Sequence, residues 1–158
     1  MKEVLVLRHA KAEPAHGPLE DHERDLAPSG ISAAREVGKR LVELGLLPER
    51  ILCSDAVRAR RTAEMSSSEM PSPPSIELFA ELYTADSHDY FELLQKCPPE
   101  INRVLIVAHN PTVEVFLGQA SGRELAMKTA ALAVLRFETS DWRSVVPGAA
   151  VEPARLLS

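Results

Sequence analysis

The sequence has few cysteines and no long hydrophobic run, and each absence excludes a class of protein. Its 158 residues include only two cysteines, Cys53 and Cys97, which stand far apart in no paired spacing. Neither a disulfide scaffold nor a cysteine-based zinc site is therefore predicted. The first apolar run stops at Arg8, so it is too short for a signal-peptide core or a membrane span. We expect a cytoplasmic protein without membrane association.

Positive charge is also scarce. The chain carries 18 lysines and arginines against 23 acidic residues, and its formal net charge is −5 at pH 7. Binding along a nucleic-acid backbone requires a basic face, so nucleic acid is not an expected partner and any cationic site must be local. A hydrophobic content of 45% and a charged content of 26% are ordinary for a globular protein. A chain of this length can bury one core, which predicts a single domain.

Predicted strands alternate with predicted helices along the chain. Four aliphatic residues at 4–7 are typical of a buried strand in a parallel sheet. Further strands are predicted at residues 50–54, 75–79, 102–110, 131–138 and 144–151, and helices at 29–44, 54–68, 88–96 and 111–120. This alternation predicts an α/β fold, a single three-layer domain with a mostly parallel central sheet and helices on both faces.

Basic and imidazole side chains follow three of the predicted strands. Arg8 and His9 end the first strand, Arg58 follows the second, and His109 ends a later one. Because open α/β sheets bind ligands at the carboxyl ends of their strands, we expect these groups to converge. Guanidinium forks suit a phosphate, and an imidazole can attack phosphorus to form a phosphohistidine. The set predicts a phosphoryl-transfer site that requires no metal and no cofactor.

Four ordered motifs resemble those of a known family. LRHAKAE is similar to its Arg-His-Gly signature, DHERDLAPSG to its Arg-x-Leu-Thr-x-x-Gly element, CSDAVRARRTAE to its Ser-x-x-x-Arg-x-x-x-Thr segment, and VAHNP carries a second histidine. The family is the histidine phosphatase, or phosphoglycerate mutase-like, superfamily, and the resemblance is strongest to its short phosphohistidine phosphatase branch. It spans nearly the whole chain and implies one histidine phosphatase domain over residues 1–158.

The resemblance implies roles for five residues. His9 would be the nucleophile, and Arg8 and Arg58 would clamp the phosphate. His109 would donate a hydrogen bond to the phosphoryl oxygens, and Arg24 would be an auxiliary phosphate-binding group. By the same resemblance the protein would be a metal-independent hydrolase of the phosphatase class.

The chain also departs from the family pattern. Ala10 stands where glycine is usual, which reduces backbone freedom after the nucleophile, and Ala27 stands where threonine is usual. The proton donor implied by the resemblance is Glu81, in FAELYTAD. Phosphohistidine needs such an acid less than an alkyl ester does, because an imidazole leaves more readily than an alkoxide.

Two alternative sites can be weighed from the spacing. A cysteine phosphatase would resemble Cys-x5-Arg, but four residues separate Cys53 from Arg58 and no glycine-rich loop intervenes. The loop HGPLEDHERD offers metal-ligand types without tight helical pairing, and a polar surface is the commoner meaning of such a run. Its candidate ligands are His16, Asp21, His22 and Asp25. We predict no metal.

The expected substrate class depends on whether the chain contains a long insertion that could cover the site. Relatives with long insertions build a lid that selects small sugars or glycerates, and no insertion of that size is evident here. We therefore expect a phosphatase of phosphomonoesters or phosphoramidates, acting on protein phosphohistidine of a phosphorelay or phosphotransfer partner. The alternatives are a phosphatase of small phosphoesters or nucleotides, and a binding module that holds a phosphorylated ligand without turnover.

Overall fold

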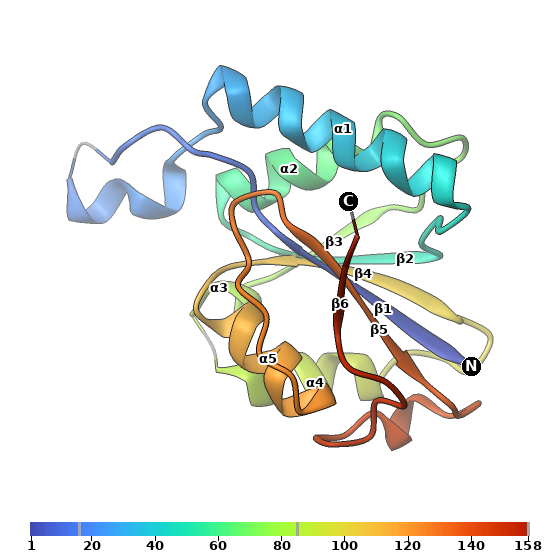
Figure 1. The fold of residues 1–158 in the computed structure, drawn as a ribbon. Helices are drawn as coiled ribbons and strands as arrows, with labels where there is room; N and C mark the ends of the chain where they lie inside the picture. The colour runs from blue at the N-terminus through green and yellow to red at the C-terminus, as the bar shows by residue number, and fades with distance from the viewer. Residues whose placement is uncertain (16, 85, 158) are drawn as a thin grey trace.

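The structure, a computed structural model, describes residues 1–15, 17–84 and 86–157 and contains a 6-stranded sheet between two layers of helices (Figure 1). The strands are β1 (Lys2–Arg8), β2 (Arg50–Ser54), β3 (Ile76–Phe79), β4 (Arg103–Ala108), β5 (Leu132–Phe137) and β6 (Arg155–Leu157). The α-helices are α1 (Pro28–Leu44), α2 (Val57–Ser67), α3 (Glu81–Thr84), α4 (Ser87–Gln95) and α5 (Thr112–Ser121), and the 3-10 helices are η1 (Pro18–Glu23) and η2 (Trp142–Ser144).

The sheet is mostly parallel, which confirms the predicted fold class. Its order is β3-β2-β4-β1-β5-β6, with parallel pairing from β3 to β1 and antiparallel pairing of β5 with both of its neighbours. In the centre, β1 and β4 pair in the register Val4 with Val104 and Arg8 with Ala108. The carboxyl ends of β1, β2 and β4 therefore meet at one edge of the sheet.

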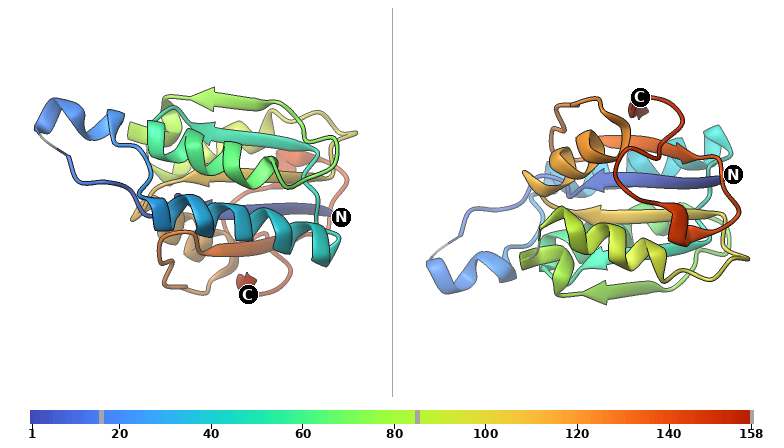
Figure 2. Two further views of the ribbon diagram at one scale, coloured as in Figure 1. Left: turned by 90° about the horizontal axis from the view of Figure 1, so that it is seen from above. Right: turned by 90° about the horizontal axis from the view of Figure 1, so that it is seen from below.

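Helices cover both faces of the sheet because successive strand residues point to opposite sides. Val4 and Val6 belong to the core shared with α4 and α5, whereas Leu5 and Leu7 pack in the core shared with α1 and α2. All four side chains are fully buried. The two views of Figure 2 show these helical layers on either side of the strands.

Most predicted elements lie within one or two residues of the observed ones, but the last predicted strand is wrong. Residues 144–151 form no strand, because Pro147 lacks a backbone donor and Gly148 turns the chain with a φ of 81°. The sixth strand is β6 instead, which pairs with β5. Within the described parts of the chain, no helix has the length and apolar character needed to cross a membrane.

Candidate active site

The two motif histidines lie side by side because they follow adjacent parallel strands. His9 comes directly after β1 and His109 directly after β4, and the His9 backbone N–H donates to the carbonyl oxygen of Ala108 at 3.0 Å. Their ring centroids are 5.1 Å apart. Only 7% of His9 and 8% of His109 is exposed. The predicted convergence of the strand ends is therefore present in the structure.

The His9 ring is held in one tautomer. Its Nδ1 lies 2.8 Å from the carbonyl oxygen of Ala10. A carbonyl can only accept, so Nδ1 must carry the proton and Nε2 keeps its lone pair. Burial lowers the pKa of His9 to about 4, and the positive charges of Arg58 and Arg8 act in the same direction against the hydrogen bond to Ala10. At neutral pH the ring is an uncharged imidazole with a free nucleophilic nitrogen.

The backbone after His9 is fixed by α2. Ala10 donates its N–H to the Thr62 hydroxyl at 3.0 Å, and that hydroxyl donates to the carbonyl oxygen of Arg58 at 2.7 Å. Ala10 is fully buried and is not among the residues with a positive φ. The position therefore does not require glycine. The other departure, Ala27, precedes α1 without a side-chain cap hydrogen bond, which a threonine there would be able to make.

His109 contacts the end of β2. Its Nε2 lies 2.7 Å from the hydroxyl oxygen of Ser54, and its Nδ1 is buried without a hydrogen-bond partner. Burial lowers the pKa of His109 to about 3, and electrostatic repulsion from His9 and Arg58 acts in the same direction. This ring is also uncharged at neutral pH, so any hydrogen bond it donates comes from a neutral imidazole.

Two arginines complete the group. Arg58, in the first turn of α2, is 6% exposed, and its two terminal nitrogens donate to the backbone oxygen and the carboxylate of Asp21 at 2.7 and 3.2 Å. Arg8 donates from one terminal nitrogen to the carbonyl oxygen of Met127 at 3.0 Å. The Nε atoms of both arginines are buried without a partner. These two Nε–H groups are unpaired donors near the strand ends, which an oxyanion could satisfy, and Nδ1 of His109 is a third buried nitrogen without a partner there.

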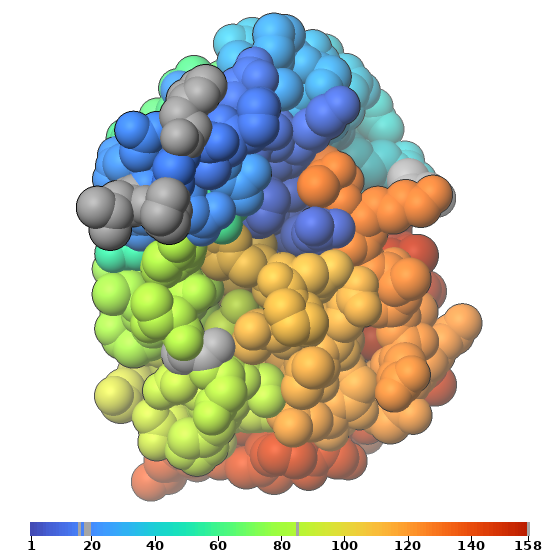
Figure 3. Space-filling view, turned by 90° about the vertical axis from the view of Figure 1, so that its left-hand side faces the viewer, coloured from blue at the N-terminus to red at the C-terminus, as the bar shows by residue number. Residues whose placement is uncertain are grey.

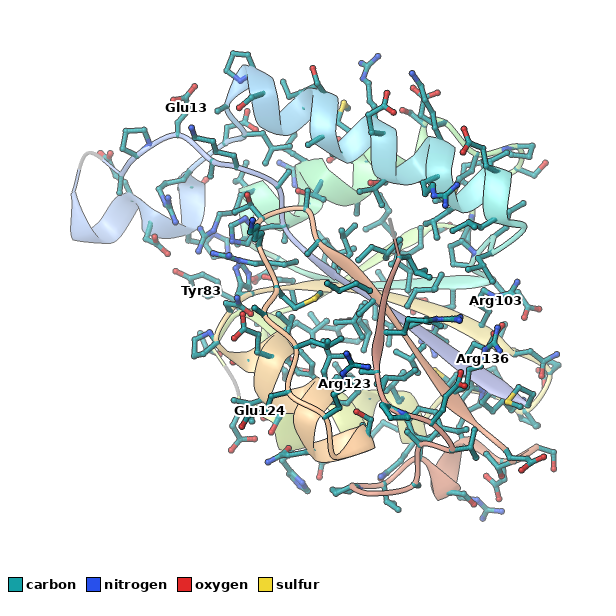
Figure 4. The ribbon with its side chains drawn as sticks, in the orientation of Figure 1. Glu13, Tyr83, Arg103, Arg123, Glu124 and Arg136 are labelled. Atoms are coloured by element: carbon teal, nitrogen blue, oxygen red, sulfur yellow. The ribbon has the colours of Figure 1, made fainter. Side chains whose placement is uncertain are left out.

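Sequence reasoning missed the contacts of Asp21, which links Arg58 to Arg24. The Asp21 carboxylate accepts hydrogen bonds from the Tyr83 hydroxyl at 2.7 Å and from Nε of Arg24 at 3.0 Å, in addition to Arg58. The Tyr83 hydrogen bond and the Arg58 charge hold the pKa of Asp21 below its usual range. Tyr83 also meets the His109 ring edge-on at a centroid distance of 5.4 Å. Figure 4 shows Tyr83 on the side of the molecule from which η1 projects.

Arg24 lies near the histidines without contacting them. Its Nε binds Asp21, and a terminal nitrogen donates to the backbone oxygen of Glu13 at 3.3 Å. Its charge contributes to the lowered pKa of both His9 and His109. The predicted auxiliary cation is therefore close enough to act electrostatically on the site.

Glu81 is placed differently from the other predicted residues. It is the first residue of α3 and its side chain is exposed. No hydrogen bond or ion pair in the described part of the chain connects it with His9 or His109. The same short helix directs Tyr83 toward the site instead. Its role as proton donor stays a prediction.

Cys53 faces the interior rather than the arginine. The thiol is fully buried and donates to the carbonyl oxygen of Ser54 at 3.2 Å. Burial raises the pKa of Cys53 far above its ordinary value. A protonated thiol inside the sheet is no nucleophile, which agrees with the rejection of a cysteine phosphatase.

The acidic loop uses its side chains in separate contacts. Asp21 binds the two arginines, His22 lies 2.9 Å from a carboxylate oxygen of Asp55, and Asp25 accepts from the backbone of Leu26 at 2.7 Å. His16 lies outside the described residues. Over residues 1–15, 17–84 and 86–157, no group of three or more histidine, cysteine and acidic side chains is arranged to hold a metal ion.

Figure 3 shows the face of the molecule on which η1 and Tyr83 lie, the left-hand side of Figure 4. Three parts of the chain meet there, namely the amino-terminal segment with η1, the segment around α3, and the segment that follows β4. No single segment of the sequence could build this face alone.

The chain matches known proteins over most of its length. The profile of the histidine phosphatase superfamily (branch 1) matches residues 4–83. An uncharacterized protein of Mycobacterium tuberculosis is 32% identical over 156 residues, covering 91% of this chain and 94% of the relative. An uncharacterized chloroplastic protein of Arabidopsis thaliana is 28% identical over 150 residues, covering 89% of this chain and 69% of the relative.

Solved structures agree with the sequence matches. A candidate phosphohistidine phosphatase SixA from Agrobacterium tumefaciens superimposes with a TM-score of 0.81 at 28% identity, covering 99% of this chain and 96% of that one. The protein histidine phosphatase SixA complexed with tungstate has a TM-score of 0.80 at 24% identity over 99% of this chain and 94% of that one, a likeness of fold. Profile, relatives and fold together show that this chain belongs to the histidine phosphatase superfamily, and they support phosphatase activity.

Proposed function

We propose that the protein hydrolyses a phosphomonoester or a phosphoramidate through a phosphohistidine intermediate on His9. The observation that carries the proposal is the state of the His9 ring, which is neutral, has Nδ1–H bound to Ala10, and keeps the Nε2 lone pair free. Nε of Arg8, Nε of Arg58 and Nδ1 of His109, all without a partner, lie at the same end of the sheet. A nucleophile beside donors for the phosphoryl oxygens is the arrangement that phosphoryl transfer requires.

The reaction has two steps. In the first, Nε2 of His9 attacks phosphorus and the bond from phosphorus to the leaving oxygen or nitrogen breaks. The leaving group takes a proton from solvent water or from Glu81, the predicted acid, and solvent regains one proton when phosphate is released. In the second, water attacks the phosphohistidine, the N–P bond breaks, and inorganic phosphate leaves while His9 is restored. Arg8 and Arg58 stabilise the charge on the phosphoryl oxygens in both steps. These residues need no metal ion for either step.

The preferred substrate is phosphohistidine carried by a protein. Its leaving imidazole needs little protonation. This suits a site whose predicted acid, Glu81, is exposed and has no hydrogen bond or ion pair with the histidines in the described part of the chain. The name of the Agrobacterium tumefaciens neighbour points the same way. Small phosphoesters and nucleotides are the alternative substrates.

A trapping experiment tests the intermediate. Labelled phosphohistidine protein is mixed with the enzyme and quenched in alkali, and we expect an alkali-stable, acid-labile phosphoenzyme with the label on His9. His9→Ala should abolish both the label and the turnover, whereas His88→Ala, which changes an exposed histidine of α4, should leave both unchanged. Turnover by His9→Ala, or label on His109, would contradict the mechanism.

A substrate panel separates the alternatives. Phosphohistidine protein, an alkyl phosphate and a nucleotide are compared by the rate of phosphate release, and we expect the phosphohistidine protein to be hydrolysed fastest. Tight binding without phosphate release in every case would show a binding module instead. The panel is repeated after chelation, where unchanged rates are expected because imidazole and guanidinium groups supply the chemistry.

A further inference from the structure

The ring of His109 contacts the hydroxyl group of Ser54, which has no role in the proposed mechanism. Ser54 is the last residue of β2 and is fully buried. Its hydroxyl oxygen lies 2.7 Å from Nε2 of His109 and accepts the backbone N–H of Ala56 at 3.2 Å. No other partner of this hydroxyl is present in the described part of the chain. Which of Ser54 and His109 donates the hydrogen bond therefore follows from these two partners of the hydroxyl.

Counting protons decides the direction. If His109 donated from Nε2, the Ser54 proton would have no acceptor, and Nδ1 of His109 would be a buried acceptor without a donor. If Ser54 donates to Nε2, the hydroxyl is satisfied on both sides and Nδ1 carries the ring proton. The second arrangement leaves one buried polar group unmatched instead of two, and unmatched buried groups are costly.

We propose that Ser54 is a positioning residue that holds His109 in the Nδ1–H tautomer, so that the ring offers a hydrogen-bond donor to the phosphoryl group. The proposal rests on the proposed function of this site. It explains why a serine hydroxyl is buried at the end of β2, where an apolar side chain would leave Nε2 without a partner.

The tautomer matters because His109 is uncharged. A protonated imidazolium would donate from both nitrogens, but burial and the neighbouring positive charges keep the pKa of His109 near 3, well below neutral pH. A neutral ring donates from one nitrogen only. With the proton on Nε2, the ring would present a lone pair from Nδ1, which repels phosphoryl oxygens. Donation from Nδ1 therefore depends on which nitrogen Ser54 occupies.

The two histidines then have the same tautomer and opposite uses. In His9 the Nδ1 proton is bound by the Ala10 carbonyl oxygen, and the free atom is the Nε2 lone pair. In His109 the Nε2 lone pair is bound by Ser54, and the free atom is the Nδ1 proton. One ring can attack phosphorus while its neighbour, at a centroid distance of 5.1 Å, stabilises the oxygens.

The tautomer can be measured directly. Protein labelled with nitrogen-15 at histidine is studied at neutral pH by long-range proton–nitrogen NMR, which distinguishes protonated from unprotonated ring nitrogens, with His109→Asn used for assignment. We expect wild-type His109 to be protonated on Nδ1 and Ser54→Ala to shift the ring toward the Nε2–H form. Wild-type protonation on Nε2, or an unchanged tautomer in Ser54→Ala, would overturn the proposal.

A matched control and an activity measurement complete the test. Ser66→Ala removes another fully buried hydroxyl, which donates to the carbonyl oxygen of Ala34 away from the site, so it should change stability without changing the tautomer. Ser54→Ala should lower kcat about tenfold with little change in KM, because an oxyanion donor acts mainly in the transition state. Ser54→Cys, which keeps a weaker donor, should recover part of that loss.

Failure of this inference is distinguishable from failure of the proposed function. Absence of phosphate release by the wild-type protein would show that the proposed function is wrong, and the spectra would still report the tautomer. An active wild-type enzyme whose kcat is unchanged in Ser54→Ala would overturn the positioning role alone.

Discussion

The two ends of the sheet both carry buried or half-buried charges, but they use them in opposite ways. At the amino end of β1, Lys2 is 1% exposed and its ammonium group donates to the carbonyl oxygens of Pro99 and Ile101 and the side chain of Asn102, at 2.6, 2.8 and 2.9 Å. An ammonium group has three donors, so every one is satisfied. The hydrogen bonds at this end offset the cost of burying the charge.

The next residue at that end is paired just as fully. Glu3 accepts from Arg103 at 2.7 Å with one oxygen and from Arg136 at 3.0 Å with the other. Figure 4 shows Arg103 and Arg136 at the end of the sheet opposite Tyr83.

At the carboxyl end, Arg8 and Arg58 each have a buried Nε without a hydrogen-bond partner. Nδ1 of His109 is also buried without a partner. Guanidinium groups at the amino end are paired with a carboxylate, whereas those at the carboxyl end each keep one buried donor without a partner. Unmatched donors, rather than charge itself, identify the functional end.

The largest effect should come from removing an arginine at the carboxyl end, compared with removal of one at the amino end. Arg58→Ala should weaken the inhibition by tungstate or phosphate about 100-fold, because charge-assisted hydrogen bonds are each worth roughly 1.5–3 kcal/mol. Arg136→Ala, the matched control, removes a guanidinium already paired with Glu3 and should leave the inhibition constant unchanged. An unchanged constant in Arg58→Ala would remove that residue from the site.

The free energy of unfolding should fall in acid because of His9, at the carboxyl end of the sheet. The pKa of His9 in the folded protein is about 4, below the value of about 6.5 for an unfolded chain. The unfolded state therefore binds more protons as the pH falls below about 6.5, and stability is lost progressively until about pH 4. For His9 alone this loss is on the order of 2 kcal/mol between pH 7 and pH 5.

Urea unfolding of wild-type protein and His9→Ala at pH 7 and pH 5 measures that loss. The substitution itself changes the free energy of unfolding at both pH values. The quantity to compare is therefore the difference between pH 7 and pH 5 within each protein. The loss should be smaller in His9→Ala and unchanged in Lys2→Met, which alters the opposite end. An equal loss in wild type and His9→Ala would contradict the lowered pKa.

A smaller effect, on phosphate affinity, is expected from replacing Asp21. Asp21 is ionised at neutral pH, since its pKa is lowered, and it contacts Arg58 and Arg24. Asp21→Asn keeps a hydrogen-bond acceptor but removes a negative charge, so phosphate should bind several-fold more tightly. The gain is limited because the Asp21 carboxylate is partly exposed and solvent screens its charge. Glu20→Gln, on the exposed side of η1, is the control and should change binding little. Weaker binding in Asp21→Asn would show that the carboxylate mainly holds Arg58 in place.

The smallest effect should come from Glu81→Gln with phosphohistidine as substrate. If Glu81 is the proton donor, the variant should slow hydrolysis of an alkyl phosphate roughly tenfold and that of phosphohistidine or nitrophenyl phosphate less than about twofold. The reason is that the latter leaving groups need little protonation. Steady-state rates on the three substrates test this, and equal losses would exclude the role.

Sequence reasoning found the residues that follow strands. Arg8, His9 and His109 could be predicted because an aliphatic run predicts a strand, and parallel strands bring their carboxyl ends together. The contacts of Asp21 were not predictable, because Tyr83 is 62 residues away along the chain and nothing in the spacing links the two. The strand predicted at 144–151 failed because Pro147 and Gly148 interrupt it. The sixth strand forms at β6 instead, through pairing with β5 that the spacing does not reveal.

By itself the sequence determined the alternation of strands and helices, the family motifs and the identity of the groups at the strand ends. These are local properties, since hydrophobic periodicity and turn residues act over a few positions. The tertiary structure decided which donors stay unpaired, which carboxylate contacts Arg58, and which nitrogen of His109 is bound by Ser54. Those outcomes depend on side chains brought together from distant segments, where burial makes each unmatched hydrogen-bonding group matter.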